Sequence, residues 1–549
     1  MRIWVCGQRG LLCIAATVVA AAGLAVSSRA SGAPPTWEEL EARGARIAGI
    51  EIRVLNVFDT SKPDERYWLA RAANFVHIES RKSVVGRELL FKAGDRVDAR
   101  LIRETERNLR DLEFVRDASI VPEGEADGTV WARVEVRDAW SLKGGLKYGH
   151  VGGQTTWRFR VHEVNFLGLG KQIILGHQED PERTTDEIAY ADPQLFGTHW
   201  TLEANYQKLS DGKGKLLRLE RPFYALDVPW SVGAEGSSQE SVLTLYDRGH
   251  AVFAVPERLD SASLFYSRAY AIRDRTAFRI GAEFRLGQAR YGALGTLRAG
   301  WLPEPRLRDR RLRGIALTWS VAQDRFESYE NLAAVNRVED YNLGWFANVS
   351  LGCFSTALGS SENAPFGDFR LDKGWLVSPQ TLLLLDARAQ GRRPARGWEG
   401  VLSTGSLTVY DQHLPWQTLA ANLTLDAALR PDPEQWLYIG GPEGLRGYDS
   451  WMAAGDRRWV FSVEDRVVTP WRLWGLAQVG FVAYADAGAI RRFDTGSWSR
   501  TYSDVGLGLR FGNLKSAFGR VILLTVAVPL VKEPGMDSYQ IVVGNVLRF

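Results

Sequence analysis

Short segments with alternating apolar and polar side chains recur from Trp140 to the last residue, Phe549, and turn residues separate them without a long helix. Alternate side chains of a strand point to opposite faces, so each segment has one apolar and one polar face. Strands of about ten residues with this pattern are typical of a barrel that meets lipid outside and a polar lumen inside. The pattern predicts a transmembrane β-barrel over residues 139–549. The soluble alternative, a propeller or tandem sandwiches, would need a blade-sized repeat, and none is visible.

Residues 1–30 have the features of a signal peptide. Arg2 and Arg9 precede an apolar stretch, and Ser28 and Ala30 provide the small side chains of a cleavage site. We therefore expect export and cleavage; an uncleaved membrane anchor is the alternative. Cleavage would leave Cys353 as the only one of three cysteines, which excludes an internal disulfide.

A different pattern occupies residues 47–138, after a segment at 31–46 that we interpret as a linker. Alternating residues predict a first strand, helical spacing follows, and two alternating segments end the region. The order strand, helix, helix, strand, strand predicts a small α+β domain with one buried sheet face. The expected elements are a strand at 47–58, helical segments at 67–78, 83–91 and 98–110, and two strands before residue 139.

The segment LLFKAGDRVDARLIRETERNLRDLEFVRDASI, residues 89–120, resembles a POTRA domain, the polypeptide-transport-associated module. The resemblance includes the glycine before the second helix and the Leu-Arg pair near its end. It implies a periplasmic domain that binds extended client segments at a sheet edge. A generic α+β domain is the alternative.

Three motifs in the last quarter of the chain carry a second resemblance. They are GGPEGLRGYDS at 440–450, FSVEDRVVTP at 461–470 and VAYADAG at 482–488. Together they resemble the outer-membrane assembly factor superfamily, the BamA/TamA-type or bacterial surface antigen family. The resemblance implies that an extracellular loop folds back into the lumen with the tip Leu445, Arg446, Gly447 and Tyr448. It also implies a strand motif that includes Tyr484, Asp486 and Gly488.

Alternation alone predicts which side chains of these strands face the lumen. It places Glu464 on one strand, and Tyr484 and Asp486 on the next, on the inner face. An arginine of an inserted loop would find two carboxylates there. We therefore expect Arg446 to pair with Asp486, Glu464 or both. An exposed Arg446 on a solvated loop is the alternative.

The final strand and the strand number complete the fold prediction. The last strand has alternate hydrophobic residues and a terminal aromatic, which is typical of a barrel sorting signal: Tyr539, Ile541, Val543, Leu547 and Phe549. A barrel that begins and ends on the periplasmic side has an even number of strands. Five strands are expected after the loop at 440–448, and the family resemblance favours 16 antiparallel strands, with 18 as the alternative.

Neither enzyme chemistry nor nucleic-acid binding is indicated. The chain lacks nucleophile, metal-protease and phosphate-loop motifs, and its net charge is only +3. We expect no enzyme activity, cofactor or metal. The predicted function is assembly, insertion or translocation of outer-membrane clients through a lateral seam or lumen. Alternatives are a two-partner-secretion transporter and a passive pore or surface protein. Expected partners are outer-membrane lipid, lipopolysaccharide near the arginines at 306–313, unfolded client polypeptides, and periplasmic or lipoprotein subunits.

Overall fold

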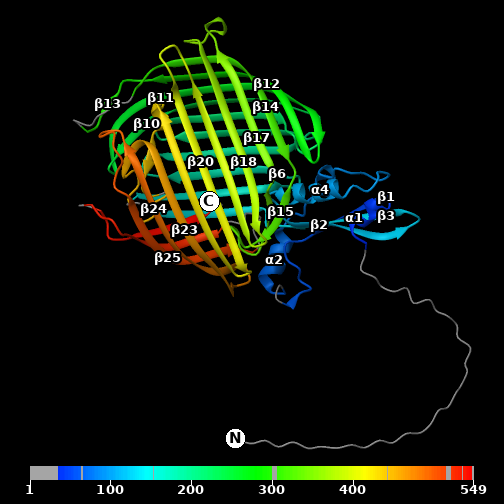
Figure 1. Cartoon of the computed structure of the whole chain (residues 1–549). Coiled ribbons are helices and arrows are strands. Elements are labelled where there is room, and N and C mark those ends of the chain that lie inside the picture. Colours follow the sequence, from blue (N-terminus) through cyan, green and yellow to red (C-terminus); the bar gives the residue numbers. More distant parts are fainter. Residues whose placement is uncertain are drawn as a thin grey trace, which may run out of the picture.

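The computed structural model describes residues 35–546 apart from 64–65, 152–153, 299–305, 442, 515–520 and 534–535. The signal peptide expected at 1–30, and Leu547 and Phe549 of the expected sorting strand, lie outside the described residues. Figure 1 shows a large barrel with a small domain at one end. We name residues 35–138 the front domain, the barrel end beside it the domain end, and the opposite end the far end.

The front domain is a three-stranded mixed sheet with helices. Its order is β1-β3-β2, with β1 parallel and β2 antiparallel to β3. The strands are β1 (Arg46–Leu55), β2 (Val115–Ala126) and β3 (Thr129–Asp138), and the helices are α1 (Trp37–Ala42), α2 (Trp68–Val76), α3 (Lys82–Arg87) and α4 (Ala99–Asp111). One face of β3 is fully buried because Val130, Ala132, Val134 and Val136 alternate with polar neighbours.

The interpretation of residues 31–46 as a linker is wrong for its second half. Helix α1 begins after Thr36, whose side chain and that of Glu39 cap the first turn reciprocally. Trp37 and Leu40 of this helix belong to the core of the front domain. The indole Nε1 of Trp37 donates a 2.7 Å hydrogen bond to the Ile120 carbonyl oxygen of β2. Two buried apolar residues are enough to draw this short segment into the domain.

The barrel is a closed sheet in which strands that follow one another in sequence pair antiparallel. The sheet closes between its last and first strands, β27 and β4. Its full-length strands are β4 (Leu142–Val151), β5 (Gln154–Phe166), β6 (Lys171–Glu179), β7 (Thr184–Leu195), β8 (Trp200–Leu209), β9 (Gly212–Arg221), β10 (Trp230–Asp247), β11 (His250–Arg273), β12 (Thr276–Tyr291), β14 (Arg310–Gln323), β17 (Trp345–Phe354), β18 (Ala364–Ser378), β19 (Thr381–Arg392), β20 (Glu399–Leu414), β21 (Gln417–Leu429), β23 (Ala453–Leu473), β24 (Ala477–Arg492), β25 (Tyr502–Asn513), β26 (Val521–Pro529) and β27 (Gln540–Val546).

The predicted strand number of 16, or alternatively 18, is wrong. Among the described residues the closed sheet has 22 strands. Two of them, β13 (Gly295–Thr296) and β22 (Leu437–Ile439), are short segments beside strands that also pair directly, β12 with β14 and β21 with β23. The five strands expected after the loop are present as β23 to β27. The error lies before the loop, where the family resemblance favoured fewer strands than the chain forms.

The barrel wall has an apolar exterior, as β26 illustrates. Ile522, Leu524, Val526 and Val528 are exposed, whereas the residues between them are buried. This alternation along closed antiparallel strands is the surface that a lipid-embedded barrel requires. The helices of the described chain include none long and apolar enough to span a membrane.

Helix α4 joins the front domain to the barrel. Its N-cap Asp98 accepts a hydrogen bond from the Leu101 amide, and its apolar face packs into the domain core. The opposite, charged face is also buried because it docks on the barrel. Arg107 lies 2.7 Å from Asp324 at the end of β14, and Arg110 lies 2.9 Å from Asp340.

Burial at this junction shifts two ionisations on α4. It lowers the pKa of the Arg107 guanidinium and raises the pKa of the Glu104 carboxyl. The Glu104 carboxylate also accepts a 2.7 Å hydrogen bond from the Leu226 amide, in the turn between β9 and β10. The junction therefore contains paired, poorly solvated charges that depend on both domains.

Candidate functional site

The candidate site is the loop at residues 440–451, which we name the lock loop. It lies between β22 and β23, at the far end of the barrel wall. Gly440, Gly441 and Gly444 have positive φ angles, which glycine adopts without strain. These turns return the chain toward the lumen, where the tip residues are buried.

Arg446 lies between the two carboxylates expected from the sequence. Its Nε and Nη2 donate to the two oxygens of Asp486, each at 2.7 Å, and its Nη1 donates to Glu464 at 2.5 Å. The guanidinium also lies 3.5 Å from the centroid of the Tyr484 ring. The side chains of Asp486 and Glu464 are 0% and 3% exposed, so these charges depend on one another rather than on water.

Two neighbours of Arg446 anchor the tip by packing. Leu445 and Tyr448 are buried in a cluster with Ile439, Ile490 and Tyr502. The Tyr448 hydroxyl donates to the Ser503 carbonyl oxygen at 2.7 Å and accepts from the Ser503 amide at 3.1 Å. The apolar and polar contacts of the tip therefore act together.

Glycine is needed at positions 447 and 506 because neighbouring side chains approach the backbone too closely for a Cβ atom. A Cβ at Gly447 would lie 2.6 Å from the Cβ of Asp504, and a Cβ at Gly506 would lie 2.2 Å from the Tyr484 ring. The tip thus rests on β25, and the Tyr484 ring crosses the same strand. Gly488 has a related constraint, because its Cβ would lie 2.8 Å from the Trp459 carbonyl oxygen.

A third carboxylate, Asp504, is part of the site but was not expected from the sequence. It is directly opposite Asp486 in the pairing of β24 with β25 and is fully buried. Its carboxyl lies against the lock loop, because a Cβ at Gly447 would be 3.1 Å from the Asp504 Cγ. Its alternation on β25 places it on the lumen face, which was the available signal. Asp504 lies beside another carboxylate, Asp486, whereas Glu464 pairs with Arg446, so the two residues affect the charge balance of the site in different ways.

A hairpin between β14 and β17 enters the lumen from the domain end. It consists of β15 (Phe326–Glu330) and β16 (Val338–Asn342), and we name residues 326–342 the plug hairpin. Leu332 at its tip packs with Leu382, Tyr410 and Ala420 on one side of the wall. Val335 packs with Val482 of β24 and Leu523 of β26, further along the same wall. The hairpin leaves the wall between β14 and β17, so it extends through the lumen to the sector β19–β26.

Buried arginines connect the plug hairpin to the lock loop. Arg466 donates to Glu464 at 2.7 Å and to the Leu332 carbonyl oxygen at 2.9 Å. Glu464 thereby joins Arg466 to Arg446. Arg510 donates to the Ala333 carbonyl oxygen at 3.0 Å. A continuous polar path thus runs from the lock loop at the far end to the plug hairpin at the domain end.

Sequence reasoning missed the plug hairpin, although one signal was available. Turns on the periplasmic side of such barrels are short, whereas residues 324–344 separate β14 from β17. Asn331 and Asn336 lie in the turn at the tip of the hairpin, between β15 and β16. Both have positive φ angles, a conformation that asparagine tolerates.

The lock loop also contacts the last strand. The Gln540 side chain of β27 donates to Asp449 at 3.0 Å, and Gln540 is buried on the lumen side. Its neighbours Tyr539 and Ile541 are exposed, and Val543 is half-buried. Asp465, which the alternation along β23 places on the lipid face, accepts a 2.9 Å hydrogen bond from the Gln417 side chain at the start of β21, near the domain end of the wall.

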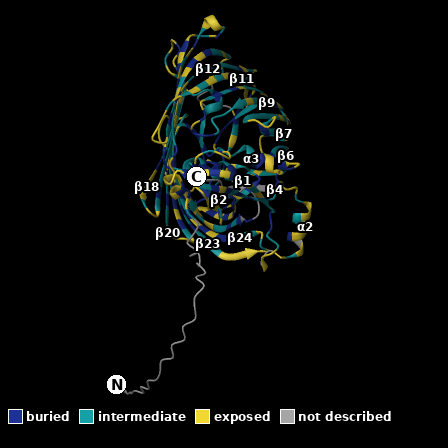
Figure 2. Cartoon of the chain, turned by 90° about the vertical axis from the view of Figure 1, so that its right-hand side faces the viewer, coloured by how far each residue is buried: buried dark blue, intermediate teal, exposed yellow. Residues whose placement is uncertain are grey.

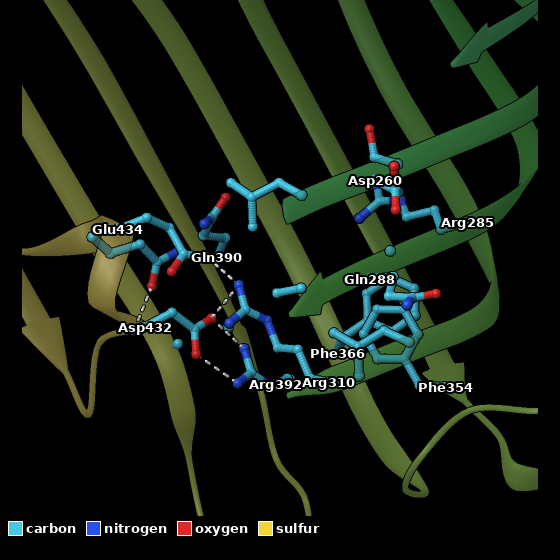
Figure 3. Close-up of a pocket in the computed structure, with 18 of the residues that line it drawn as sticks. Asp260, Arg285, Gln288, Arg310, Phe354, Phe366, Gln390, Arg392, Asp432 and Glu434 are labelled. Carbon is cyan, nitrogen blue, oxygen red and sulfur yellow. Dashed lines mark hydrogen bonds and ion pairs between the residues drawn. The ribbon is translucent and has the colours of Figure 1, made fainter. Parts of the chain in front are cut away.

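A polar cavity of about 460 Å³ lies in the far half of the lumen (Figure 3). Arg392 donates to both oxygens of Asp432, at 2.7 and 2.8 Å. Arg310 pairs with Glu434 in the same cavity. Arg310 therefore points inward, whereas Arg308 and Arg311 of the same arginine-rich segment are exposed.

No family model and no curated protein matches this sequence. BamA from Haemophilus ducreyi lacking POTRA domains 1–3 is similar at 13% identity, covering 90% of this chain and 84% of that chain, with a TM-score of 0.38. CdiB from Escherichia coli shares 13% identity over 91% and 76%, with a TM-score of 0.42. CdiB from Acinetobacter baumannii shares 14% over 91% and 74%, with a TM-score of 0.39. All three TM-scores are below 0.5.

Proposed function

We propose that this chain is an outer-membrane factor, without enzyme activity, that inserts or translocates client polypeptides. The front domain recruits clients in the periplasm, and the barrel passes them through the seam between β27 and β4. The contact of Asp449 with Gln540 carries this proposal, because it joins the lock loop to a seam strand. Release of the loop would remove a support of that strand.

The lengths of the seam strands support a lateral route. The described part of β27 has 7 residues and β4 has 10, whereas β10 and β11 have 18 and 24. Fewer ladder hydrogen bonds hold a shorter strand pair together. The described seam strands are thus much shorter than β10 and β11, and a client strand would add more easily beside such short strands than in that taller part of the wall.

The two elements inside the lumen favour a lateral route over the two alternative functions. A two-partner-secretion-type transporter would export its client through the lumen, and a passive pore would need that lumen open. The plug hairpin and the lock loop both occupy the lumen, and Glu464 and Arg466 connect them. Either alternative requires that both elements leave, whereas opening the seam does not.

Cysteine cross-links at the seam test this proposal. In a Cys353→Ser background, cysteines at 142–146 are paired with cysteines at 540–544, and the pair that cross-links is used. Purified protein in liposomes should lose client-barrel insertion when oxidised and regain it on reduction. The matched control is Ser406→Cys with Thr424→Cys, directly opposed residues on β20 and β21. Insertion that persists with a locked seam contradicts the lateral route, and export of a secreted client through the locked barrel favours the secretion-type transporter.

Client recruitment is expected at the outer edge of β1. The backbone groups of residues 51–55 make no hydrogen bonds other than those to β3 in the described chain. The β2 edge is covered, because Trp37 binds the Ile120 carbonyl oxygen and Glu106 accepts from the Ile120 amide. An open edge accepts an extended segment as an added strand.

Photo-crosslinking compares the two edges. A photoreactive residue at Glu51 on β1 should capture an unfolded client, whereas one at Glu123 on β2 should not. The two side chains are equally exposed, at 45%. Equal capture at both positions would show that the edge is not the recruiting element. Lipopolysaccharide and accessory subunits remain part of the proposal, with exposed Arg308 and Arg311 at the far end as lipopolysaccharide contacts.

A further inference from the structure

Helix α2 presents an apolar face that nothing in the described chain covers. Trp68, Phe75 and Val76 are 70%, 90% and 67% exposed, and with Ala72 they form one stripe of the helix. Arg71 is exposed at the margin of this stripe. Isolated exposed apolar residues are ordinary, but two aromatic residues and a valine on one helical face indicate a surface with a partner.

The opposite face of α2 is fixed to the front domain. Ala70 is fully buried with Val57 and Phe58. The Asn74 side chain donates to the Phe58 carbonyl oxygen at 2.8 Å and accepts from the Phe58 amide at 3.1 Å. The helix cannot turn its apolar stripe inward without breaking these contacts.

The position of α2 identifies the partner. In the view from the domain end, α2 lies at the margin of the molecule beside β4 and β24, whereas β1, β2 and α3 lie in front of the lumen (Figure 2). Figure 1 likewise shows α2 beside the ends of the last strands. The helix is thus outside the lumen opening and level with the rim of the wall.

Contacts at both ends of α2 define the sector of the rim. A Cβ at Gly475, in the turn between β23 and β24, would lie 3.5 Å from the Tyr67 hydroxyl. After the helix, the Arg81 amide donates to the Gly168 carbonyl oxygen, in the turn between β5 and β6, at 2.9 Å. The strands between these two turns are β24 to β27, β4 and β5. The helix therefore lies under the seam.

Exposed aromatic residues on the adjacent turn continue the apolar stripe. Trp471 and Trp474 at the end of β23 are 60% and 83% exposed. Tryptophan at the rim of a barrel marks the level of the lipid headgroups. The stripe of α2 is continuous with this rim, and Arg71 at its margin can reach phosphate groups.

We propose that α2 is a membrane-interface helix, seated in the phospholipid leaflet on the domain side of the barrel directly under the β27–β4 seam. Trp68, Phe75 and Val76 enter the boundary between headgroups and acyl chains, and Arg71 contacts phosphates. The front domain is thereby held at the membrane by α2 in addition to the α4 junction. This proposal requires only that the barrel is embedded in lipid, so it stands or fails independently of the client function.

Site-directed spin labelling of the full chain in phospholipid nanodiscs tests the proposal. In a Cys353→Ser background, a nitroxide is placed by Phe75→Cys, with Ala72→Cys as a second position on the stripe. Leu351→Cys on the lipid face of β17 is the membrane control, and Glu125→Cys on β2 is the water control. Phe75 and Ala72 are exposed, so these changes leave the fold intact.

Accessibility to oxygen and to a water-soluble nickel chelate gives the result. The labels at residues 75 and 72 should resemble the label at 351, with the ratio of oxygen to nickel accessibility several-fold higher than at 125. Strong nickel accessibility equal to that of residue 125 would overturn the proposal. Low accessibility to both reagents would also overturn it, because it would indicate a protein partner or a second copy of the chain.

Discussion

Replacement of Arg446 by alanine tests whether the lock loop depends on its ion pairs. Arg446 donates three charge-assisted hydrogen bonds to Asp486 and Glu464, whose side chains are at most 3% exposed. Breaking a buried pair costs about 3–5 kcal/mol, and the arginine itself is 17% exposed. We expect the equilibrium constant for docking of the lock loop to fall by roughly 10²–10⁴-fold, since each 1.36 kcal/mol of free energy changes an equilibrium constant tenfold. The packing of Leu445 and Tyr448 should leave the barrel folded and the loop partly docked.

Hydrogen exchange of residues 440–451 in detergent-solubilised protein measures this change, and client insertion measures its consequence. Asp486→Asn should accelerate exchange in a related way. The loss of docking free energy in the double variant should be about 1–3 kcal/mol smaller than the sum of the losses in the two single variants, because both changes remove the same interaction. Arg446→Lys is the matched control: it retains the charge but not the paired geometry, and should give an intermediate rate.

Asp504→Asn separates a specific pair from a general effect of lumen charge. Asp504 is directly opposite Asp486, but the ion pairs of Arg446 in the described chain are with Asp486 and Glu464. Burial beside Asp486 disfavours a second negative charge at Asp504, and asparagine keeps this position neutral, so exchange in the lock loop should be unchanged or slower. Strictly additive losses for Arg446→Ala and Asp486→Asn, or faster exchange in Asp504→Asn equal to that in Asp486→Asn, would refute the docking of Arg446 by its partners.

Three further results are expected. Replacing the plug hairpin, residues 326–342, by a short Gly-Ser linker should raise conductance in planar bilayers, and an unchanged conductance would mean that the hairpin does not close the lumen. Among the described residues, Arg107→Ala leaves the buried Asp324 with one ion pair, the 3.2 Å contact to Arg275, so protease cleavage between the domains should accelerate. Arg43→Ala at an exposed pair is the control and should have no effect. Val543→Arg should slow barrel assembly, because an arginine on the lipid face costs about 2–4 kcal/mol at mid-membrane. Phe549→Ala should slow assembly less, and heat-modifiable migration on gels measures both rates. Normal assembly of the arginine variant would contradict the placement of Val543 on the lipid face of β27.

The alternation along the last strands was sufficient to predict the lumen face of the site. Glu464, Tyr484 and Asp486 face inward because a strand has a period of two residues, a local property that any sequence displays directly. Arg446 was expected to meet them because a family resemblance supplied the fold of its loop. Which carboxylate it contacts was left open, and the structure shows both.

Helix α4 shows what the local sequence pattern does not predict. Helical spacing predicted a helix at 98–110, and its apolar Ile102 and Leu109 are buried, but the face with Glu104 and Arg107 is also buried. A charged surface is predicted to be solvated unless a partner with opposite charge is known. That partner, Asp324, is more than 200 residues away in sequence, and only tertiary structure brings the two together.

The sequence by itself determined that this chain forms a barrel wall with an α+β domain before it, because periods of two and of 3.6 residues are properties of short segments. Tertiary structure alone decided how many strands close the barrel, that residues 326–342 fold into the lumen, and that Asp504 joins the site. Each of these depends on contacts between segments distant in sequence, whose free energy appears only when the barrel closes. Barrel closure depends on strand tilt and stagger around the whole sheet, and no single strand encodes these quantities.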